Sequence, residues 1–281
     1  MIIRVRQVAA VCALGAALTA CAATPQAPRA KAAHPAPSAA APSHPPTLAP
    51  GPSGLTPVFT HGPRTPARTV ALTFDADMTA DQGARAAAGE HFDNPRLIAT
   101  LRTLKVPATV FMTGRWAEEY PAEARSIGRD PLFEVANHSY SHYAFTGDCY
   151  GLPTLSEDRM RSDLERAYTA FREAGVPDAM PYFRFPGGCY DRTALKALTP
   201  AGVTAVQWDV VSGDAFATDV DAVASQVLDG VRPGSVVVMH CTRSAAPATE
   251  RAVRRIVPEL RARGYRFVKV SQLIGAQGGP S

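Results

Sequence analysis

A small set of polar residues in this 281-residue chain has the types and spacing needed for hydrolytic metal chemistry. His138 and His142 lie four residues apart, a spacing that places two side chains on one face of a helical turn. Two imidazoles held in this way can bind one transition metal. An isolated pair of this kind is more often made of loop histidines with ordinary hydrogen bonds, so the assignment depends on residues elsewhere in the chain.

Two carboxylates and a third histidine supply the remaining parts of such a site. Asp75 and Asp77 are two residues apart, so on an extended segment both side chains project to the same side. Asp77 would complete a site with three protein ligands and an open position, which is what a hydrolytic zinc centre needs. Asp75 can then take a proton from a metal-activated water, and His240 can donate one to the leaving group.

Short apolar segments that alternate with helical patterns must position these residues. We expect strands at 69–74, 108–112, 133–136, 182–185, 204–208, 236–239 and 266–270. Helices are expected over 94–104, over 249–263, and between a capping-box pair, Thr154 and Glu157, and Gly175. This alternation predicts an α/β fold in the form of a distorted (β/α) barrel of about seven parallel strands, either closed or incomplete.

The polar residues fall where these strands end. Asp75 and Asp77 follow the first strand, and the two histidines follow the third. The residues that end or follow the later strands are Arg184 with Gly187-Gly188, Asp209 with Asp214, and His240. The C-terminal ends of barrel strands converge on one rim, so we expect these side chains to meet there. Asp209 fits equally well as a helix cap and is given no catalytic role.

Five motifs, in order, resemble the polysaccharide deacetylase family, which is the NodB homology domain or carbohydrate esterase family 4. They are Thr73-Phe74-Asp75-Ala76-Asp77, His138-Ser139-Tyr140-Ser141-His142, Arg184-Phe185-Pro186-Gly187-Gly188, Trp208 to Asp214, and Val238-Met239-His240. The resemblance covers roughly residues 68–274. It implies a distorted barrel and metal-dependent removal of acetyl groups from sugars.

The resemblance also implies a role for each matching residue. Asp75 would be the general base, oriented by Arg184, and His240 the general acid, paired with Asp214. The metal ligands would be Asp77, His138 and His142, with Zn²⁺ the expected ion and Co²⁺, Mn²⁺ or Ni²⁺ as alternatives. The backbone N–H of Gly187 would help to hold the oxyanion, and Val238 would contact the acetyl methyl group.

The chain departs from the family pattern at three positions. The usual adjacent Asp-Asp is here Asp75-Ala76-Asp77, as in a subset of the family. The aromatic residue usual after the fourth-motif acid is Ala215, with Phe216 following, and the Leu of the fifth motif is Val238. The last two departures bear on substrate choice more than on chemistry.

The N-terminal part of the sequence predicts export and anchoring. Residues 1–20 begin with Arg4 and Arg6, continue through an apolar run, and end in a segment that resembles a lipoprotein cleavage box before Cys21. We expect lipidation of Cys21 and a protein held to the cell membrane or envelope, in the periplasm or on the outer surface. Residues 21–66 are rich in Pro and Ala and are expected to form a disordered tether, which leaves 67–276 as the catalytic domain.

The cysteines and the charge balance bear on disulfide bonding and on the kinds of partner that the protein binds. Cys149 and Cys189 follow neighbouring strands, so we predict a disulfide between them, with Cys241 as the competing partner. A total of 29 basic against 25 acidic residues gives no case for nucleic-acid binding, and we expect a monomer.

Three functions remain open at the sequence level. The first is removal of N-acetyl groups from an envelope or extracellular polysaccharide, such as peptidoglycan or chitin-like oligomers. The second is O-acetyl esterase activity on a polysaccharide, because both reactions use the same residues. The third is a non-catalytic glycan-binding module, which the presence of both Asp75 and His240 disfavours. A zincin protease is excluded because Ser139 stands where that motif needs Glu.

Overall fold

The structure of the protein is a computed structural model, and it describes residues 44–277. The strands are β1 (Val58–Phe59), β2 (Thr69–Ala76), β3 (Ala108–Met112), β4 (Phe133–Asn137), β5 (Tyr182–Phe183), β6 (Thr204–Val206), β7 (Val210–Val211), β8 (Ser235–His240) and β9 (Arg266–Phe267). The α-helices are α1 (Gly83–Ala87), α2 (Pro95–Thr103), α3 (Gly114–Glu119), α4 (Pro121–Gly128), α5 (Glu157–Ala174), α6 (Arg192–Leu198), α7 (Val220–Gly230), α8 (Thr249–Ala262) and α9 (Val270–Gln277). Short 3-10 helices are η1 (Pro52–Gly54), η2 (Ala80–Gln82), η3 (Pro186–Gly188) and η4 (Thr199–Ala201).

The strands form one parallel sheet that curls into an incomplete barrel. The strand order is β1-β6-β5-β4-β3-β2-β8-β7, and β9 pairs with the start of β2. Every ladder between these strands is parallel. No ladder within residues 44–277 joins the edge strands β1 and β7, so the barrel stays open. The predicted distorted α/β barrel is therefore confirmed in its incomplete form.

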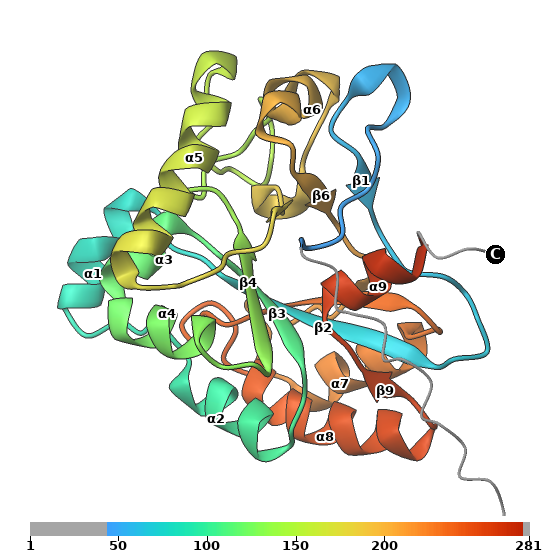
Figure 1. Cartoon of the computed structure of the whole chain (residues 1–281). Coiled ribbons are helices and arrows are strands. Elements are labelled where there is room, and N and C mark those ends of the chain that lie inside the picture. Colours follow the sequence, from blue (N-terminus) through green and yellow to red (C-terminus); the bar gives the residue numbers. More distant parts are fainter. Residues whose placement is uncertain (1–43, 278–281) are drawn as a thin grey trace, which may run out of the picture. The chain divides into compact units, whose positions relative to one another are not determined.

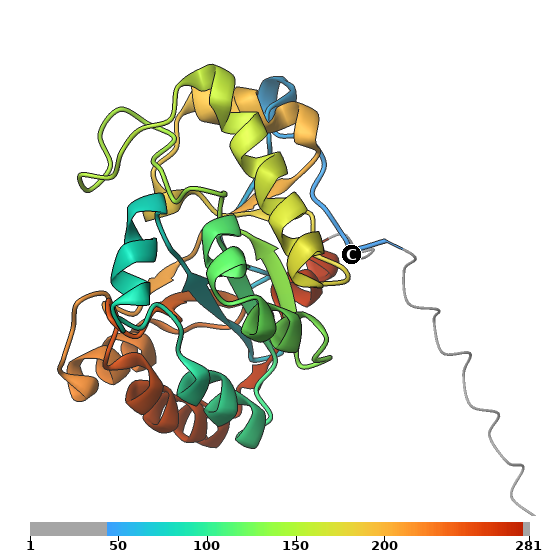
Figure 2. The same ribbon diagram turned by 90° about the vertical axis from the view of Figure 1, so that its left-hand side faces the viewer.

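The longer helices that cover the sheet, among them α2, α5, α7 and α8, each bury apolar side chains. Figure 1 shows α2 and α8 below strands β2 and β3, with α3, α4 and α5 on another side. Figure 2, turned by 90°, shows α5 above and α8 below the same strands. On α8 the side chains of Val253, Ile256, Val257 and Leu260 are fully buried, as expected for an amphipathic helix against a sheet. The sheet interior is apolar, with Leu72 and the other inner residues of β2 also fully buried.

The folded domain begins earlier than the sequence predicted. The sequence predicts a disordered tether over residues 21–66, but β1 lies in this range and pairs with β6 (Figure 1). The Tyr182 hydroxyl donates to the Pro46 carbonyl at 2.7 Å, and the side chain of Phe59 is buried. The boundary at residue 67 is wrong because a Pro-rich segment can still supply an edge strand with one apolar anchor.

The remaining N-terminal predictions concern residues that the structure does not describe. These are the signal segment 1–20, Cys21, and the tether up to residue 43. Within residues 44–277, no helix is long and apolar enough to cross a membrane.

Candidate active site

The first of the predicted site residues, Asp75, lies close to the end of β2, at the rim of the barrel. Its side chain is buried, and Oδ1 accepts a 2.6 Å hydrogen bond from the Arg184 guanidinium. Arg184 is fully buried, donates from Nε to the Val206 carbonyl, and lies 3.9 Å from the centroid of the Phe111 ring. Burial lowers the pKa of Arg184, and the Asp75 carboxylate opposes that shift. The pair therefore fixes the direction in which the free Asp75 oxygen points.

His138 is held against the same pair. Its Nδ1 lies 2.9 Å from the carbonyl oxygen of Arg184, and this contact makes Nδ1 the donor. Its Nε2 lies 3.6 Å from Asp75 Oδ2. A histidine fixed through Nδ1 by a backbone carbonyl, with Nε2 directed inward, is the usual arrangement of a metal-binding histidine.

His142 pairs with the second carboxylate. Its Nε2 lies 3.4 Å from Asp77 Oδ2, and its ring centroid is 5.0 Å from that of His138. Burial lowers the pKa of His142 to about 4, so the imidazole is neutral at pH 7 and can act as a ligand. Burial raises the pKa of Asp77, but His142, His240 and the Thr242 hydroxyl lower it more, and Asp77 is ionised.

The histidine segment is a bent loop and not the helical turn that the spacing suggested. Ser139 and His142 both have positive φ, at +72° and +57°. Asn137 Oδ1 accepts from the Ser139 N–H at 2.8 Å, and the Asp163 carboxylate on α5 accepts from the Tyr140 N–H at 2.7 Å. These bonds to side chains, rather than helical bonds, bring the two imidazoles together.

The donor types at this rim suit a divalent transition metal. Within residues 44–277, however, no group of three or more His, Cys, Asp or Glu side chains is already gathered as a metal-holding cluster. The donors instead form two close pairs, Asp75 with His138 and Asp77 with His142. Two imidazole nitrogens and one carboxylate match a hydrolytic zinc site in number and kind. The residues therefore fit the ion in the chemistry of their donor atoms.

His240 and Asp214 form a third pair. Asp214 accepts from the backbone N–H of His240 and from Nδ1, each at 2.8 Å, and from the Thr249 hydroxyl. Burial lowers the pKa of His240, but the bond and the charge of Asp214 raise it more, to about 9. Burial raises the pKa of Asp214, and its hydrogen bonds to His240 and Thr249 bring it below the usual range. His240 is therefore an imidazolium at pH 7, with Nε2 free to donate.

The third-motif loop lies beside these groups. Gly187 has φ +64°, and a Cβ there would lie 2.5 Å from Cys149 Sγ, so a side chain has no room. The disulfide predicted between Cys149 and Cys189 is present and ties this loop to the histidine loop. Cys241 is free and buried. Val238 is buried in β8, two residues before His240, and it does not line the pocket described next.

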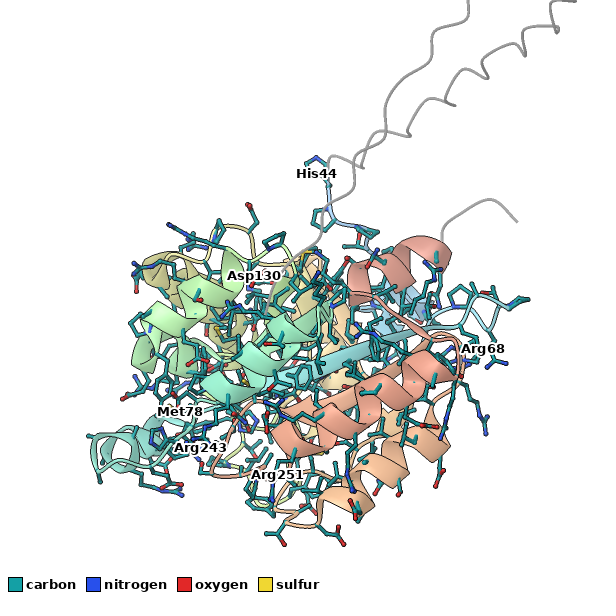
Figure 3. All side chains as sticks on the ribbon, turned by 90° about the horizontal axis from the view of Figure 1, so that it is seen from below. His44, Arg68, Met78, Asp130, Arg243 and Arg251 are labelled. Carbon is teal, nitrogen blue, oxygen red and sulfur yellow. A yellow bond between two sulfur atoms is a disulfide. The ribbon has the colours of Figure 1, made fainter. Side chains whose placement is uncertain are left out.

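A pocket of about 250 Å³ opens beside the metal-ligand candidates. It is lined by Asp77 and His142 and by residues from other rim loops, among them Leu152, Phe216 and Thr242. Figure 3 shows Met78 and Arg243, which follow β2 and β8, at one end of the molecule, and Arg68, which precedes β2, at the other. The pocket therefore belongs to the rim formed by the C-terminal ends of the strands.

Two residues that support the site, Thr242 and Asp163, were not predicted from the sequence. The Thr242 hydroxyl donates to Asp77 Oδ1, and Asp163 accepts from two N–H groups of the histidine loop. Thr242 lies two residues after His240. Because residues two apart on an extended segment face the same side, this spacing could have indicated that Thr242 also faces the site. Asp163 is a carboxylate among the buried residues of α5. A buried carboxylate is uncommon unless it has a hydrogen-bonding or charged partner.

The polysaccharide deacetylase family model matches residues 62–206, and the chain belongs to this family. A chitooligosaccharide deacetylase of Bradyrhizobium sp. (strain ANU 289) is 29% identical over 220 residues, which is 73% of this chain and 90% of that protein. A peptidoglycan-N-acetylglucosamine deacetylase of Bacillus cereus is 29% identical over 181 residues, which is 64% of this chain and 62% of that protein.

A solved structure gives the same result. The chain matches the crystal structure of a peptidoglycan N-acetylglucosamine deacetylase bound to a naphthalenyl N-hydroxybenzamide, with 26% identity and a TM-score of 0.65. The match covers 78% of this chain and 92% of that one. The fold is thus that of carbohydrate esterase family 4, and the protein is a polysaccharide deacetylase by family.

Proposed function

We propose that the protein is a metal-dependent hydrolase that removes N-acetyl groups from an envelope or extracellular polysaccharide. The observation that carries the proposal is the pairing of Asp75 with His240 as register partners in the parallel β2–β8 ladder. Each is held by its own buried counter-ion, Arg184 and Asp214 respectively. A carboxylate and an imidazolium side by side, next to the metal-type donors Asp77, His138 and His142, are the groups that metal-dependent amide hydrolysis requires.

Asp77, His138 and His142 would hold the metal, and Zn²⁺ is the ion that this donor set suits best. A bound divalent ion would supply a Lewis acid that polarises the acetyl carbonyl and makes water a better nucleophile. Thr242 holds Asp77 through one oxygen, which leaves Oδ2 directed toward His142.

The protein groups divide the proton transfers between them. Asp75 takes a proton from the attacking water as its oxygen bonds to the acetyl carbon, and Arg184 keeps the carboxylate in place. The N–H of Gly187 donates to the oxyanion that forms. His240 then gives its Nε2 proton to the sugar nitrogen as the carbon–nitrogen bond breaks, while Asp214 stabilises the imidazolium before the transfer. The products are acetate and a free amino sugar.

The proposed substrate class is supported by relatives named as a chitooligosaccharide deacetylase and a peptidoglycan-N-acetylglucosamine deacetylase. The alternative is an O-acetyl esterase, because ester cleavage passes through the same tetrahedral intermediate and needs the same residues. The test is acetate release, with added Zn²⁺ or Co²⁺, from a panel of N-acetyl and O-acetyl sugars. Release from N-acetyl substrates supports the proposal, and release confined to O-acetyl substrates supports the esterase. Glycan binding without any acetate release would favour a non-catalytic binding module.

A second proposal concerns the localisation of the protein in the cell. An apolar leader that ends before Cys21 supports export and lipidation of that cysteine, with residues 22–43 as a tether to the membrane. The partners would then be the acetylated polysaccharide and the lipid bilayer, with the protein acting as a monomer in the periplasm or on the outer surface. Metabolic labelling with a palmitate analogue tests this: the wild type should incorporate label, and Cys21→Ser should incorporate none.

A further inference from the structure

Gln207 is a buried polar residue at the catalytic rim that has no part in the reaction as described so far. It follows β6 directly, and its side chain is 8% exposed. Its amide nitrogen Nε2 donates a 2.7 Å hydrogen bond to the carbonyl oxygen of Gly188. This bond joins the end of β6 to the third-motif loop, the loop whose Gly187 N–H is proposed to donate to the oxyanion.

The third-motif loop depends on outside contacts because two consecutive glycines form its tip. Gly187 has φ +64° and Gly188 has φ +74°. Glycine reaches many backbone conformations at similar energy, so the local chain does not fix the direction of the Gly187 N–H. That direction must be set by the groups that hold the loop on either side of the two glycines.

The two sides of the glycine pair are held differently. On one side Phe185 is fully buried, and its carbonyl accepts from the Gly188 N–H at 2.8 Å. On the other side Gln207 holds the Gly188 carbonyl, and a disulfide holds Cys189. Because the disulfide acts through rotatable side-chain bonds, the contact with Gln207 is the one that fixes the peptide group after Gly188. The Trp208 ring also packs against Gly188, but an apolar contact does not set the rotation of a peptide group.

The main chain at Gln207 is itself fixed by the first strand of the domain. The Gln207 N–H donates to the Phe59 carbonyl at 2.8 Å, which continues the parallel pairing of β1 with β6. Figure 1 shows β1 beside β6 at one edge of the sheet. The segment before residue 67 therefore supports the residue that holds the third-motif loop.

The other atom of the Gln207 amide argues against a purely stabilising role. Within residues 44–277, Oε1 is buried and has no hydrogen-bond partner. A buried acceptor without a partner destabilises the folded state. An apolar side chain of the same length would avoid that destabilisation, so a glutamine at this position points to a use for the donor Nε2 and for the bond that it makes.

We propose that Gln207 is a positioning residue for the oxyanion donor, because it holds the Gly188 carbonyl and thereby sets the direction of the Gly187 N–H. This inference rests on the proposed function for the role of that N–H. An oxyanion donor acts only when its hydrogen points to the place where negative charge develops, so a small rotation of the loop weakens it. The charge develops after the substrate has bound, so the effect of Gln207 falls on kcat and not on KM.

The first test removes the donor and keeps the size of the side chain. Gln207→Met retains its length and loses the bond to Gly188. With zinc-loaded protein and an N-acetylglucosamine hexamer, kcat should fall roughly ten- to hundredfold, and KM should stay within about twofold of the wild-type value. Both limbs of the pH profile should stay in place, because Asp75 and His240 are unchanged. An unchanged kcat, or a raised KM with kcat unchanged, would contradict the proposal.

Gln277→Met is the matched control for this substitution. Gln277 on α9 also donates from Nε2 to a main-chain carbonyl, that of His61, at 2.9 Å, and His61 pairs with Ser235 at the start of β8, away from the rim. Its kcat should equal that of the wild type. Gln207→Met should melt close to the wild-type temperature, because the substitution removes the unpartnered Oε1 together with the Nε2 bond. A Tm several degrees lower would assign the bond to stability and contradict the proposal.

Hydrogen exchange examines the third-motif loop without any turnover. In Gln207→Met the amides of a peptide that contains residues 187–189 should exchange faster than in the wild type, while peptides from α8 should exchange at the same rate. Because this measurement needs no acetate release, it separates the inference from the proposed function. Faster exchange supports the positioning of the loop by Gln207 even if the wild type releases no acetate. Equal exchange of residues 187–189 in the two proteins would overturn the inference.

Discussion

Asp214 accepts two hydrogen bonds from His240, one from the backbone N–H and one from Nδ1, each at 2.8 Å. The second bond and the charge of Asp214 raise the pKa of His240 to about 9 against the opposing effect of burial. Asp214→Asn removes that charge and should lower the pKa of His240. Because the imidazolium is the proton donor, the alkaline limb of the deacetylation pH profile should move to lower pH.

The pH profile of kcat/KM checks this prediction, with Asp219→Asn as the control. Asp219 caps α7 in the same loop region, and Asn caps as well as Asp, so its profile should match the wild type. If the alkaline limb of the Asp214→Asn profile lies at the same pH as in the wild type, His240 is not the general acid.

The same pair links stability to pH. The folded-state pKa of His240, about 9, lies above its ordinary value of 6.5, so protonation favours the folded state. This contribution is complete below pH 6.5 and is lost as the pH rises through about 9. The stability advantage of wild type over Asp214→Asn, from urea unfolding, should therefore shrink across this range. An advantage that grows with pH in the same interval would contradict the linkage.

Metal binding should depend on the rim histidines. His138→Ala removes one of three proposed ligands and should lose most of the bound metal, with about one zinc per chain expected in the wild type. Elemental analysis after dialysis measures this. His44→Ala, an exposed histidine far along the chain from the site, is the matched control and should keep its metal. Equal metal content in all three proteins would rule out this site.

Much of the fold could be read from local patterns. All seven expected strand segments contain a strand in the structure, and α2 begins after Asn94, whose side chain caps the Leu97 N–H. Runs of buried apolar residues are local signals, and strand C-termini in a parallel sheet share one edge. That is why residues as distant in sequence as Asp75 and Arg184 could be expected at one rim.

The errors arise where tertiary contacts decide the local structure. Asp209 was expected near the rim, but it accepts from the Val236 N–H beside the start of β8. After Asp209 the chain forms β7, which leads toward Asp214 at the rim. A strand of only two residues leaves no recognisable pattern in the local sequence. The capping box at Thr154 also failed, because Thr154 pairs with Ala144 and the helix begins at Glu157.

The Cys149–Cys189 disulfide should stabilise the domain. It closes a loop of 40 residues between the histidine loop and η3. A crosslink that closes a loop of this length raises the free energy of unfolding by about 3–4 kcal/mol, because it lowers the conformational entropy of the unfolded chain. A Cys149→Ser, Cys189→Ser double variant should melt several degrees below the wild type. Reducing agent should lower the melting temperature of the wild type and leave that of the variant unchanged; if both respond equally, another group is responsible.

The central claim is that Asp75 is the general base of an acetyl-removing hydrolase. Asp75→Asn retains the size of the side chain and an oxygen that faces Arg184, but its amide cannot take the proton from water. We predict that, with metal content and melting temperature close to those of wild type, acetate release from N-acetylglucosamine oligomers falls by roughly 10²–10⁴-fold, the usual contribution of a general base. Acetate release at the wild-type rate from the zinc-loaded variant would contradict the account.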